Sequence, residues 1–326
     1  MKLPCLSLAR LAAACLLPLS LAVQAQSDYP SRPVRMIVPV AAGGNVDLVA
    51  RAVAESLTKS MGQSFIVDNR PGASSLLGTQ MVAKAAPDGY TILATSTTFL
   101  SAPALLRSPG YDTVSDFAHI SLTCSIPMVM EVNPGVPARN VREFIALAKA
   151  KPGAVSYASS GIGSTGHIAA ELFSRAADIK LLHVPYKGNA QSIVDVVGGQ
   201  VAMMFDQVST SVQQIATGKL LPLGVSTKVR SAILPNVPTI AESGLPGYED
   251  ATINAIFAPA GTPREIVQRL HAEVVKAVHN PETVKRFGER GIVMVSSPST
   301  EEFSAYVKRE SARYVKLVKD VGISAE

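Results

Sequence analysis

The stretch Val34–Leu57, VRMIVPVAAGGNVDLVARAVAESL, decides the fold class of this chain. It begins with an apolar run over Val34–Val38 that stops at Pro39, and apolar residues return at helical spacing over Ala50–Leu57. Between them lies a pair of glycines, which breaks either kind of regular structure. The stretch therefore predicts a strand, a Gly-rich loop and a helix, in that order.

The same alternation continues along most of the 326 residues. Further strands are predicted at 65–67, 90–94, 128–132, 155–158, 181–185, 201–205, 221–226 and 253–257, and helices at 76–85, 141–149, 167–176, 191–197 and 212–217. The last part of the chain, about seventy residues, is chiefly helical. Strands that alternate with helices form βαβ units, so the predicted fold class is α/β.

Two passages divide this pattern into blocks, one near Pro127 and one, rich in Pro and Gly, that ends near Gly247. We place one lobe at 26–126 plus 250–326 and a second lobe at 127–249, so that the chain crosses twice between them. Two crossings form a hinge. Ligands in such architectures bind between the lobes, outside the carboxyl ends of parallel strands.

The amino terminus has the pattern of an export signal. Lys2 and Arg10 bracket a basic region, Leu11–Leu21 is apolar, and Val23–Ala25 provides a small-x-small cleavage site. We therefore predict that residues 1–25 are a signal peptide that is cleaved after Ala25, and that the protein is exported to the periplasm. The apolar part is shorter than the about 20 residues that span a bilayer, which argues against a retained anchor.

Cleavage would change the charge and the cysteine content. Loss of Lys2 and Arg10 lowers the formal net charge from +5 to +3. This mild charge gives no support to nucleic-acid binding, because the basic residues are scattered or paired with acids, and it is compatible with anionic solutes. Cys124 would remain as the single cysteine, which excludes an intramolecular disulfide, and we expect it to be a small buried hydrophobe.

Three loops rich in small residues follow predicted strands and open predicted helices. They are Pro39–Asp47 (PVAAGGNVD), Asn69–Ser75 (NRPGASS) and Ser159–His167 (SSGIGSTGH). Glycines let a ligand approach the backbone, and the unpaired N–H groups and the dipole at a helix start favour an anion. The simpler alternative is that Asn45 and Ser74 only cap their helices.

The third loop contains GIGSTG over Gly161–Gly166, which matches the GxGxxG pattern of dinucleotide sites. That fingerprint also requires an acidic residue about 20 positions further on. The next predicted strand ends instead in Val184–Lys187, which holds no acid. We therefore expect no nucleotide cofactor. The rival hypothesis, which rests on this motif alone, is an exported NAD-dependent oxidoreductase.

Four single residues each have two interpretations. Asp47 lies in the first turn of its helix, where it either interacts with the helix dipole or contacts a ligand amine. Asp206 follows an apolar strand and either points into the cleft or caps the next turn. His167 either donates to an anion or satisfies local backbone groups, and Lys187 either supplies a cation or is solvated.

Patterns typical of catalysis or metal binding are missing from the sequence. The chain has no GxSxG, HExxH or GxxxxGKS/T motif and no cluster of cysteines and histidines. Because no nucleophile–base pair or metal site is evident, we expect that the protein is not an enzyme and holds neither a metal nor a cofactor.

Seven segments, in order, resemble the Bug family, the solute receptors of tripartite tricarboxylate transporters. They are YPSRPVRMIVPVAAGGNVDLVAR, VDNRPGASSLLGTQMVAKAAPDGYTIL, YDTVSDFAHIS, VSYASSGIGSTGHIAAELF, HVPYKGNAQSIVDVVGGQVAMMFD, LPNVPTIAESGLPGYE and FAPAGTP. Together they extend over essentially the whole chain that follows the predicted signal. One such segment is a weak indication, whereas seven in order are specific.

The resemblance implies a two-lobed periplasmic binding protein of the Venus-flytrap kind (type II-like), in which each lobe is a mixed sheet flanked by helices. It also implies that backbone amides, hydroxyls and ordered waters of the first and third loops hold a ligand carboxylate. We expect a monomer that captures a small organic anion, namely a dicarboxylate, an acidic amino acid or an aromatic acid. Its partner would be a membrane permease of the tripartite type or, as for some members, a sensor kinase.

The predicted ligand-binding residues combine the positions carried over from the family with the single residues named above. They are Val40, Ala41, Ala42, Gly43, Gly44, Asn45, Asp47, Ala73, Ser74, Ser96, Thr97, Ser159, Ser160, Gly161, Ser164, Thr165, His167, Tyr186, Lys187 and Asp206.

Three departures from the family pattern bear on the ligand. Val40-Ala41-Ala42 stands where many members have an aromatic residue and prolines, which opens space and removes a stacking surface. Ser74-Ser75 replaces a frequent Gly-Gly pair and adds hydroxyls, and Ile253 stands where a tryptophan is common. The resemblance therefore indicates the class of ligand and leaves its identity open.

Overall fold

The computed structural model describes residues 29–72, 75–106 and 108–322. The predicted signal peptide lies outside these residues, as do Ala73 and Ser74 of the predicted site. The strands are β1 (Val34–Val38), β2 (Phe65–Asn69), β3 (Thr91–Ser96), β4 (Phe117–Val132), β5 (Ser156–Ser159), β6 (Leu182–Pro185), β7 (Met203–Gln207), β8 (Leu221–Val225), β9 (Ala251–Pro259) and β10 (Val293–Met294). The helices are α1 (Asn45–Met61), α2 (Leu76–Ala83), α3 (Thr98–Leu105), α4 (Val141–Ala150), α5 (Thr165–Ala177), α6 (Asn189–Val197), α7 (Val208–Ala216), α8 (Arg264–Val278), α9 (Pro281–Gly288) and α10 (Thr300–Val321).

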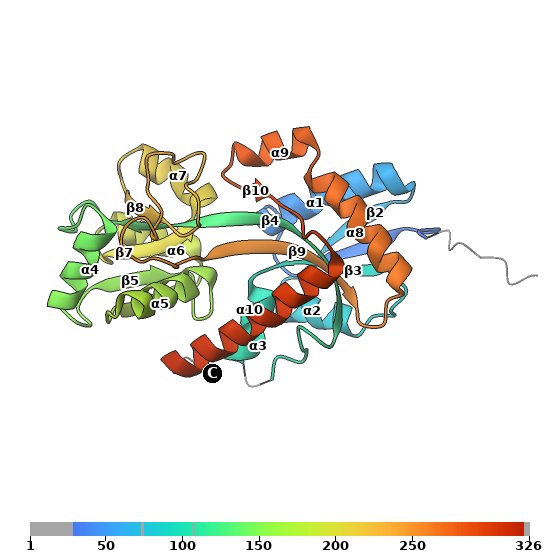
Figure 1. The fold of residues 1–326 in the computed structure, drawn as a ribbon, viewed down its shortest axis with the longest axis horizontal. Coiled ribbons are helices and arrows are strands. Elements are labelled where there is room, and N and C mark those ends of the chain that lie inside the picture. Colours follow the sequence, from blue (N-terminus) through green and yellow to red (C-terminus); the bar gives the residue numbers. More distant parts are fainter. Residues whose placement is uncertain (1–28, 73–74, 107, 323–326) are drawn as a thin grey trace, which may run out of the picture.

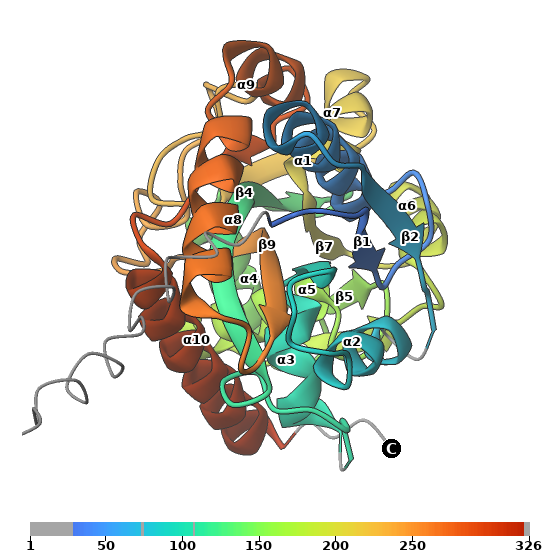
Figure 2. The same cartoon turned by 90° about the vertical axis from the view of Figure 1, so that its right-hand side faces the viewer.

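These elements form two groups that are joined by the long strands β4 and β9 (Figure 1). Lobe 1 contains β1, β2, β3, β10, most of β9, the first part of β4, and helices α1–α3 and α8–α10. Its sheet has the order β2-β1-β3-β9-β4, in which β1, β2 and β3 are parallel and β9 is antiparallel to β3. Helices α1 and α8 cover one face, and α2 and α3 the other (Figure 2).

Lobe 2 contains β5–β8, the last part of β4, and helices α4–α7. Strand β5 is parallel to β6 and β7, whereas β4 is antiparallel to β7 and β8. Each lobe therefore has a mixed sheet flanked by helices, as predicted.

The two sheets share β4, which changes partners along its length. Residues Phe117–Pro127 pair with β9, and Met128–Val132 pair with β7 and β8. Beside this switch, the Ser226 hydroxyl accepts the backbone N–H of Met128 at 3.0 Å and donates to the carbonyl of Asp250 at 2.5 Å. Ser226, which follows β8 in lobe 2, thus ties together the two segments that pass between the lobes, next to the crossings that we placed near 127 and 250.

The central strands β1, β3, β7 and β9 are buried on both faces, which explains their nearly continuous apolar sequences, whereas the edge strands β2 and β6 are partly exposed. In β3, Ile92 belongs to the core beneath α1 and α8, whereas Leu93 belongs to the core beneath α2 and α3. Lobe 2 has a separate core that includes Phe173 and Phe205. Cys124 is buried in the first of these cores, as predicted.

Sequence periodicity misses α3 and the first part of β4. The α3 sequence, TFLSAPAL, has no amphipathic pattern and holds Pro103. The first part of β4 places His119 and Ser121 inside the protein, so it lacks an apolar pattern. His119 bonds the Ser304 hydroxyl and the Thr113 carbonyl, each at 2.9 Å, which satisfies the ring after burial. The other predicted elements are present, with ends that differ by up to five residues.

Candidate functional site

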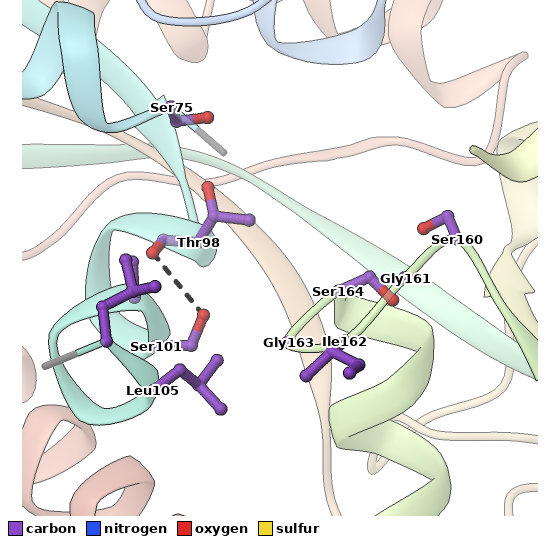
Figure 3. Close-up of a pocket in the computed structure, with 11 residues that line it drawn as sticks. Ser75, Thr98, Ser101, Leu105, Ser160, Gly161, Ile162, Gly163 and Ser164 are labelled. Carbon is purple, nitrogen blue, oxygen red and sulfur yellow. Dashed lines mark hydrogen bonds between the residues drawn. The ribbon is translucent and has the colours of Figure 1, made fainter. Parts of the chain in front are cut away.

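A cavity of about 370 Å³ lies where the two lobes meet (Figure 3). Its walls are Ser75, Thr98, Ser101, Ala102, Leu105 and Leu106 of lobe 1 and Ser160, Gly161, Ile162, Gly163 and Ser164 of lobe 2. None of these lining residues carries a charge. The cavity thus offers hydroxyl groups from both lobes, beside apolar side chains of α3 and the exposed Ile162.

The wall on lobe 2 is the turn between β5 and α5, which ends at Ser164, the N-cap residue of α5 (Figure 3). Ser164 caps this 13-residue helix, because its hydroxyl accepts the backbone N–H of His167 at 3.4 Å. Helix starts of this kind favour an anion through their N–H groups and dipole.

Two glycines of the GIGSTG segment allow close packing of protein against protein. A Cβ on Gly163 would come within 2.3 Å of Cδ1 of Leu105, which belongs to the other lobe. A Cβ on Gly166 would come within 2.6 Å of the Phe205 carbonyl oxygen on β7. The close approach of α3 to the turn and of α5 to the sheet therefore accounts for both glycines without a bound pyrophosphate.

The first Gly-rich loop is held from beneath by Asp47. This residue is 2% exposed, and its carboxylate accepts the Gly43 N–H at 2.9 Å, the Asn69 amide at 2.9 Å and the Arg51 guanidinium at 3.0 Å. Burial alone would raise the pKa of Asp47, but these hydrogen bonds outweigh it and lower the pKa. The carboxylate therefore supports the loop and is occupied by the protein's own donors.

Above Asp47 the loop itself is open to solvent. Ala41, Ala42, Gly43 and Gly44 are exposed, and a Cβ on either glycine would meet nothing within 4 Å. Helix α1 begins without a side-chain cap, so the N–H groups of its first turn are available to an anion. No residue of this loop lines the described cavity.

Asn45, at the start of α1, contacts the other lobe. Its amide donates to the Gln207 side-chain oxygen at 2.5 Å and to the Ser209 hydroxyl at 3.0 Å. Both partners lie at the junction of β7 and α7. The lobes are therefore in contact here as well as at Leu105 and Gly163.

Ser96 and Thr97 lie just before α3. The Thr97 hydroxyl accepts the Ile253 N–H at 2.9 Å, while the Thr97 N–H donates to the Ile253 carbonyl at 3.1 Å. Thr97 is therefore engaged with β9 inside lobe 1. The Ser96 hydroxyl is 3.1 Å from that of Thr98, which lines the cavity, so Ser96 lies one hydrogen bond behind the wall.

Beneath the GIGSTG turn, three rings are stacked. His167 and His183 lie 4.1 Å apart with an interplanar angle of 8°, and Tyr157 lies 4.7 Å from His183. The Ser159 hydroxyl is 2.7 Å from Nε2 of His183, and the Gly163 N–H donates to Nδ1 of His167 at 2.9 Å. His167 therefore satisfies a local backbone group, which is the second of its two predicted roles.

Asp206 belongs to a buried pair of carboxyl groups. Its oxygens accept the Gln207 N–H, the Asn189 amide and the hydroxyls of Thr210 and Ser211, at 2.6–3.2 Å. The Ser211 hydroxyl also lies 2.8 Å from Glu131, which is fully buried.

One hydroxyl has a single proton and cannot donate to both carboxylates. Burial and the neighbouring Asp206 raise the pKa of Glu131 well above its usual value. Burial also raises the pKa of Asp206, but the donors around Asp206 oppose that shift, so Glu131 is the member of the pair that favours the neutral form. Asp206 supports the starts of α6 and α7 and is occupied by protein donors.

The remaining predicted residues lie on the β6–α6 turn. The Tyr186 hydroxyl donates to Asp195 at 2.6 Å, and burial together with Asp195 raises the pKa of Tyr186 to about 12. Lys187 is exposed. Neither residue lines the cavity.

Three of the predicted ligand-binding residues line the cavity: Ser160, Gly161 and Ser164. Those that do not line it are Val40, Ala41, Ala42, Gly43, Gly44, Asn45, Asp47, Ser96, Thr97, Ser159, Thr165, His167, Tyr186, Lys187 and Asp206. The sequence reasoning missed Thr98, Ser101 and Leu105 because it missed α3. Their only local signal is the Ser/Thr-rich run that follows β3.

Comparison with known proteins places this geometry in a family. The sequence model of the tripartite tricarboxylate transporter family receptors (TctC) matches residues 49–323. A UPF0065 protein from the tcbD-tcbE intergenic region of Pseudomonas sp. strain P51 is 38% identical over 91% of this chain and 88% of that protein. BugT of Bordetella pertussis is 33% identical over 90% of each chain.

Solved structures agree with this placement. The periplasmic binding protein BugD has a TM-score of 0.76 and 35% identity, over 91% of this chain and all of that one. An R. palustris protein solved with adipate has a TM-score of 0.78 and 34% identity, over 91% and 99%. MatC from Rhodopseudomonas palustris, with bound malate, has a TM-score of 0.75 and 29% identity, over 89% and 100%. The predicted two-lobed binding-protein fold is confirmed.

Proposed function

Because the chain belongs to the tripartite tricarboxylate transporter receptor family, we propose that it captures a small organic carboxylate in the cavity between its lobes. The observation that carries this proposal is the cavity wall, which combines hydroxyls of both lobes with the start of α5. Two relatives that cover almost the same length were solved with adipate and with malate.

Neutral donors suit this task. A carboxylate that leaves water must regain hydrogen bonds, and backbone amides and hydroxyls provide them without the cost of burying a counter-charge. Ser160 and Ser164 from lobe 2 and Thr98 and Ser101 from lobe 1 are the side chains placed to donate. The first loop, with its open glycines and uncapped helix start, is our proposed second anion contact.

The apolar part of the wall limits the ligand further. Leu105, Leu106 and Ile162 lie beside the donors, so one region of the ligand meets hydrocarbon. We infer a compact carboxylate with an apolar body, such as an aliphatic dicarboxylate. This shape agrees with adipate better than with a ligand that is polar throughout.

The protein would act in the periplasm, after removal of residues 1–25, and would deliver its ligand to a membrane permease of the tripartite type. None of the helices within residues 29–322 is long and apolar enough to cross a membrane. A sensor kinase that reads the closed lobes is the alternative partner. We propose binding without catalysis, as in the receptors to which the chain is similar.

The test is direct. Mass spectrometry of material that co-purifies with the protein, followed by calorimetry with adipate and malate, should reveal a bound carboxylate. Ser160→Asp and Gly44→Asp place a negative charge against the anion and should weaken binding, whereas Ala232→Asp adds the same charge to an exposed loop and should not.

Unchanged affinity in Ser160→Asp would refute the cavity as the site. Thermal stabilisation by NAD but by no carboxylate would favour the oxidoreductase instead.

A further inference from the structure

The stacked rings beneath the GIGSTG turn are buried ionisable groups that carboxylate capture does not itself require. His167 on α5 is 3% exposed and Tyr157 on β5 is fully buried, while His183 on β6 is half-buried. The three rings are nearly parallel, with interplanar angles of 8° between the imidazoles and 14° between Tyr157 and His183. Two histidines distant in sequence thus form one stack directly below the cavity wall.

The contact of His167 with the turn depends on protonation. Nδ1 of His167 accepts the Gly163 N–H, so this nitrogen must be free of a proton. A proton on Nδ1 would set two donors against each other at 2.9 Å and break the bond. Gly163 lines the cavity and touches Leu105 of lobe 1, so this bond fixes the part of the turn that the ligand and the other lobe both meet.

The other imidazole holds the beginning of the same turn. The Ser159 hydroxyl donates to the Gly161 carbonyl at 3.1 Å and accepts the Gly161 N–H at 3.2 Å. Nε2 of His183, 2.7 Å away, therefore donates to this hydroxyl, and protonation of His183 leaves that bond intact. Ser159 and Gly163 frame the 160–163 segment, which lines the cavity. The two histidines therefore hold both ends of that segment.

The charges around the stack do little to stabilise a protonated pair. Glu171 on α5 lies 4.0 Å from Nε2 of His167, but its carboxylate already accepts the Tyr157 hydroxyl. Asp206, on the neighbouring β7, is occupied by its own four donors. Two positive charges at a ring separation of 4.1 Å would repel each other strongly in this buried place.

We propose that His167 and His183 are positioning residues, which as a neutral stacked pair hold the 159–164 turn in its carboxylate-binding shape. Protonation of His167 breaks its bond to the Gly163 N–H, releases the turn and lowers the affinity for the ligand. This inference rests on the proposed function.

The direction of the effect follows from linkage. Burial lowers the pKa of both imidazoles, that of His167 to about 3, with a further contribution from His183. An unfolded or released histidine binds a proton near pH 6.5. The ordered turn therefore loses stability as the pH falls below about 6.5 and continues to lose it toward the folded pKa of His167. A histidine that touched the ligand directly would give the opposite sign, because a cation attracts the carboxylate.

The experiment is calorimetry with adipate and malate at pH 8 and pH 5.5, on the wild type and three variants. We expect the wild-type affinity to fall by up to about tenfold, the factor reached when His167 in a released turn of the free protein binds a proton near pH 6.5 while the bound form stays neutral. His167→Asn retains an acceptor for the Gly163 N–H but cannot be protonated. It should bind at pH 8 within about threefold of the wild type and lose less than about threefold at pH 5.5.

The other two variants separate positioning from general effects. His167→Leu has no acceptor and should bind at least about tenfold more weakly at both pH values. His279→Asn, at an exposed position on the opposite lobe, should behave as the wild type and so controls for the loss of a histidine. Protonation of the ligand itself affects all four proteins equally. Wild-type affinity that stays constant or rises at pH 5.5 would overturn the proposal, as would a normal His167→Leu.

A second readout does not depend on any ligand. In nuclear magnetic resonance spectra of the unliganded protein, the His167 and His183 rings should titrate at lower pH than an ordinary histidine, because burial lowers the pKa of both. The Gly163 amide should lose its protection from exchange as they do. If the amide behaves in this way but no carboxylate binds at pH 8, the proposed function fails and the positioning of the turn stands. If a carboxylate binds but the Gly163 amide is unprotected at every pH, the positioning role fails alone.

Discussion

Replacement of Gly163 by alanine tests how closely the lobes approach. Gly163 has φ +77°, and a Cβ there would lie 2.3 Å from Cδ1 of Leu105 on the other lobe. The left-handed backbone conformation costs a residue other than glycine about 1 kcal/mol, whether or not the lobes are in contact. The clash adds about 1–2 kcal/mol, at the lower part of the range for overpacking because Leu105 contributes only the tip of a flexible side chain. The clash exists only while the lobes are in contact.

The two costs therefore appear in different measurements. Calorimetry with a carboxylate ligand should show an affinity that is lower by about 5- to 30-fold, because the clash of about 1–2 kcal/mol must be overcome when the lobes close on the ligand. In the unliganded protein the lobes can separate and relieve the clash, so urea unfolding should show a loss of about 1 kcal/mol from the backbone conformation. Gly153→Ala is the matched control, since Gly153 has φ +75° and a Cβ there would meet nothing within 4 Å. It should lose the same stability and keep its affinity.

A double-mutant cycle completes the test. In a Leu105→Ala background the methyl group of Gly163→Ala meets no side chain, so the added loss of affinity should fall to less than about 0.5 kcal/mol. An equal loss of affinity in both backgrounds would show that Gly163 acts through the ligand or the turn, and the reasoning from lobe contact would be wrong.

Three further changes test other contacts. Asn45→Ala removes both hydrogen bonds from α1 to lobe 2 and should weaken ligand binding by about 3- to 10-fold in calorimetry, with little change in urea unfolding. Glu131→Gln should flatten the pH dependence of the free energy of unfolding. Because the pKa of the buried Glu131 carboxyl is raised, its contribution to stability is present at pH 4 and is lost as the pH rises. The variant should therefore gain stability relative to the wild type between pH 5 and pH 8, as measured by urea unfolding. Arg313→Ala removes the guanidinium that lies 3.2 Å from the buried carboxyl of Asp250 and should cost about 2–3 kcal/mol in urea unfolding. Arg264→Ala, the control, removes only an exposed ion pair with Glu301 and should leave the stability almost unchanged.

The positions of most strands and helices follow from local pattern. The segment VRMIV is apolar because β1 is buried on both faces, and such a run is visible without knowledge of its neighbours. The same reasoning fails for the start of β4, where buried His119 and Ser121 are satisfied by residues about 176–185 positions away. It also fails for α3, whose short sequence shows no helical stripe.

Local sequence is also insufficient to predict the role of individual residues at the site. Sequence identifies Asp47, His167 and Asp206 as groups able to contact a ligand, but it does not reveal which donors or acceptors surround them. In the folded chain, the carboxylate of Asp47 accepts hydrogen bonds from Gly43, Arg51 and Asn69. The acceptor nitrogen of His167 is bonded by the Gly163 N–H.

By itself, then, the sequence determined the α/β class, the Gly-rich turns at helix starts and the family, because each of these is written in residues that are close together or in a fixed order. Only the tertiary structure decided the cavity, which joins Thr98, Ser101 and Leu105 of α3 to the turn at 160–164. It also decided the stack of His167 on His183. Contacts between segments of two lobes depend on how the lobes pack, and packing leaves no periodic signal in the chain.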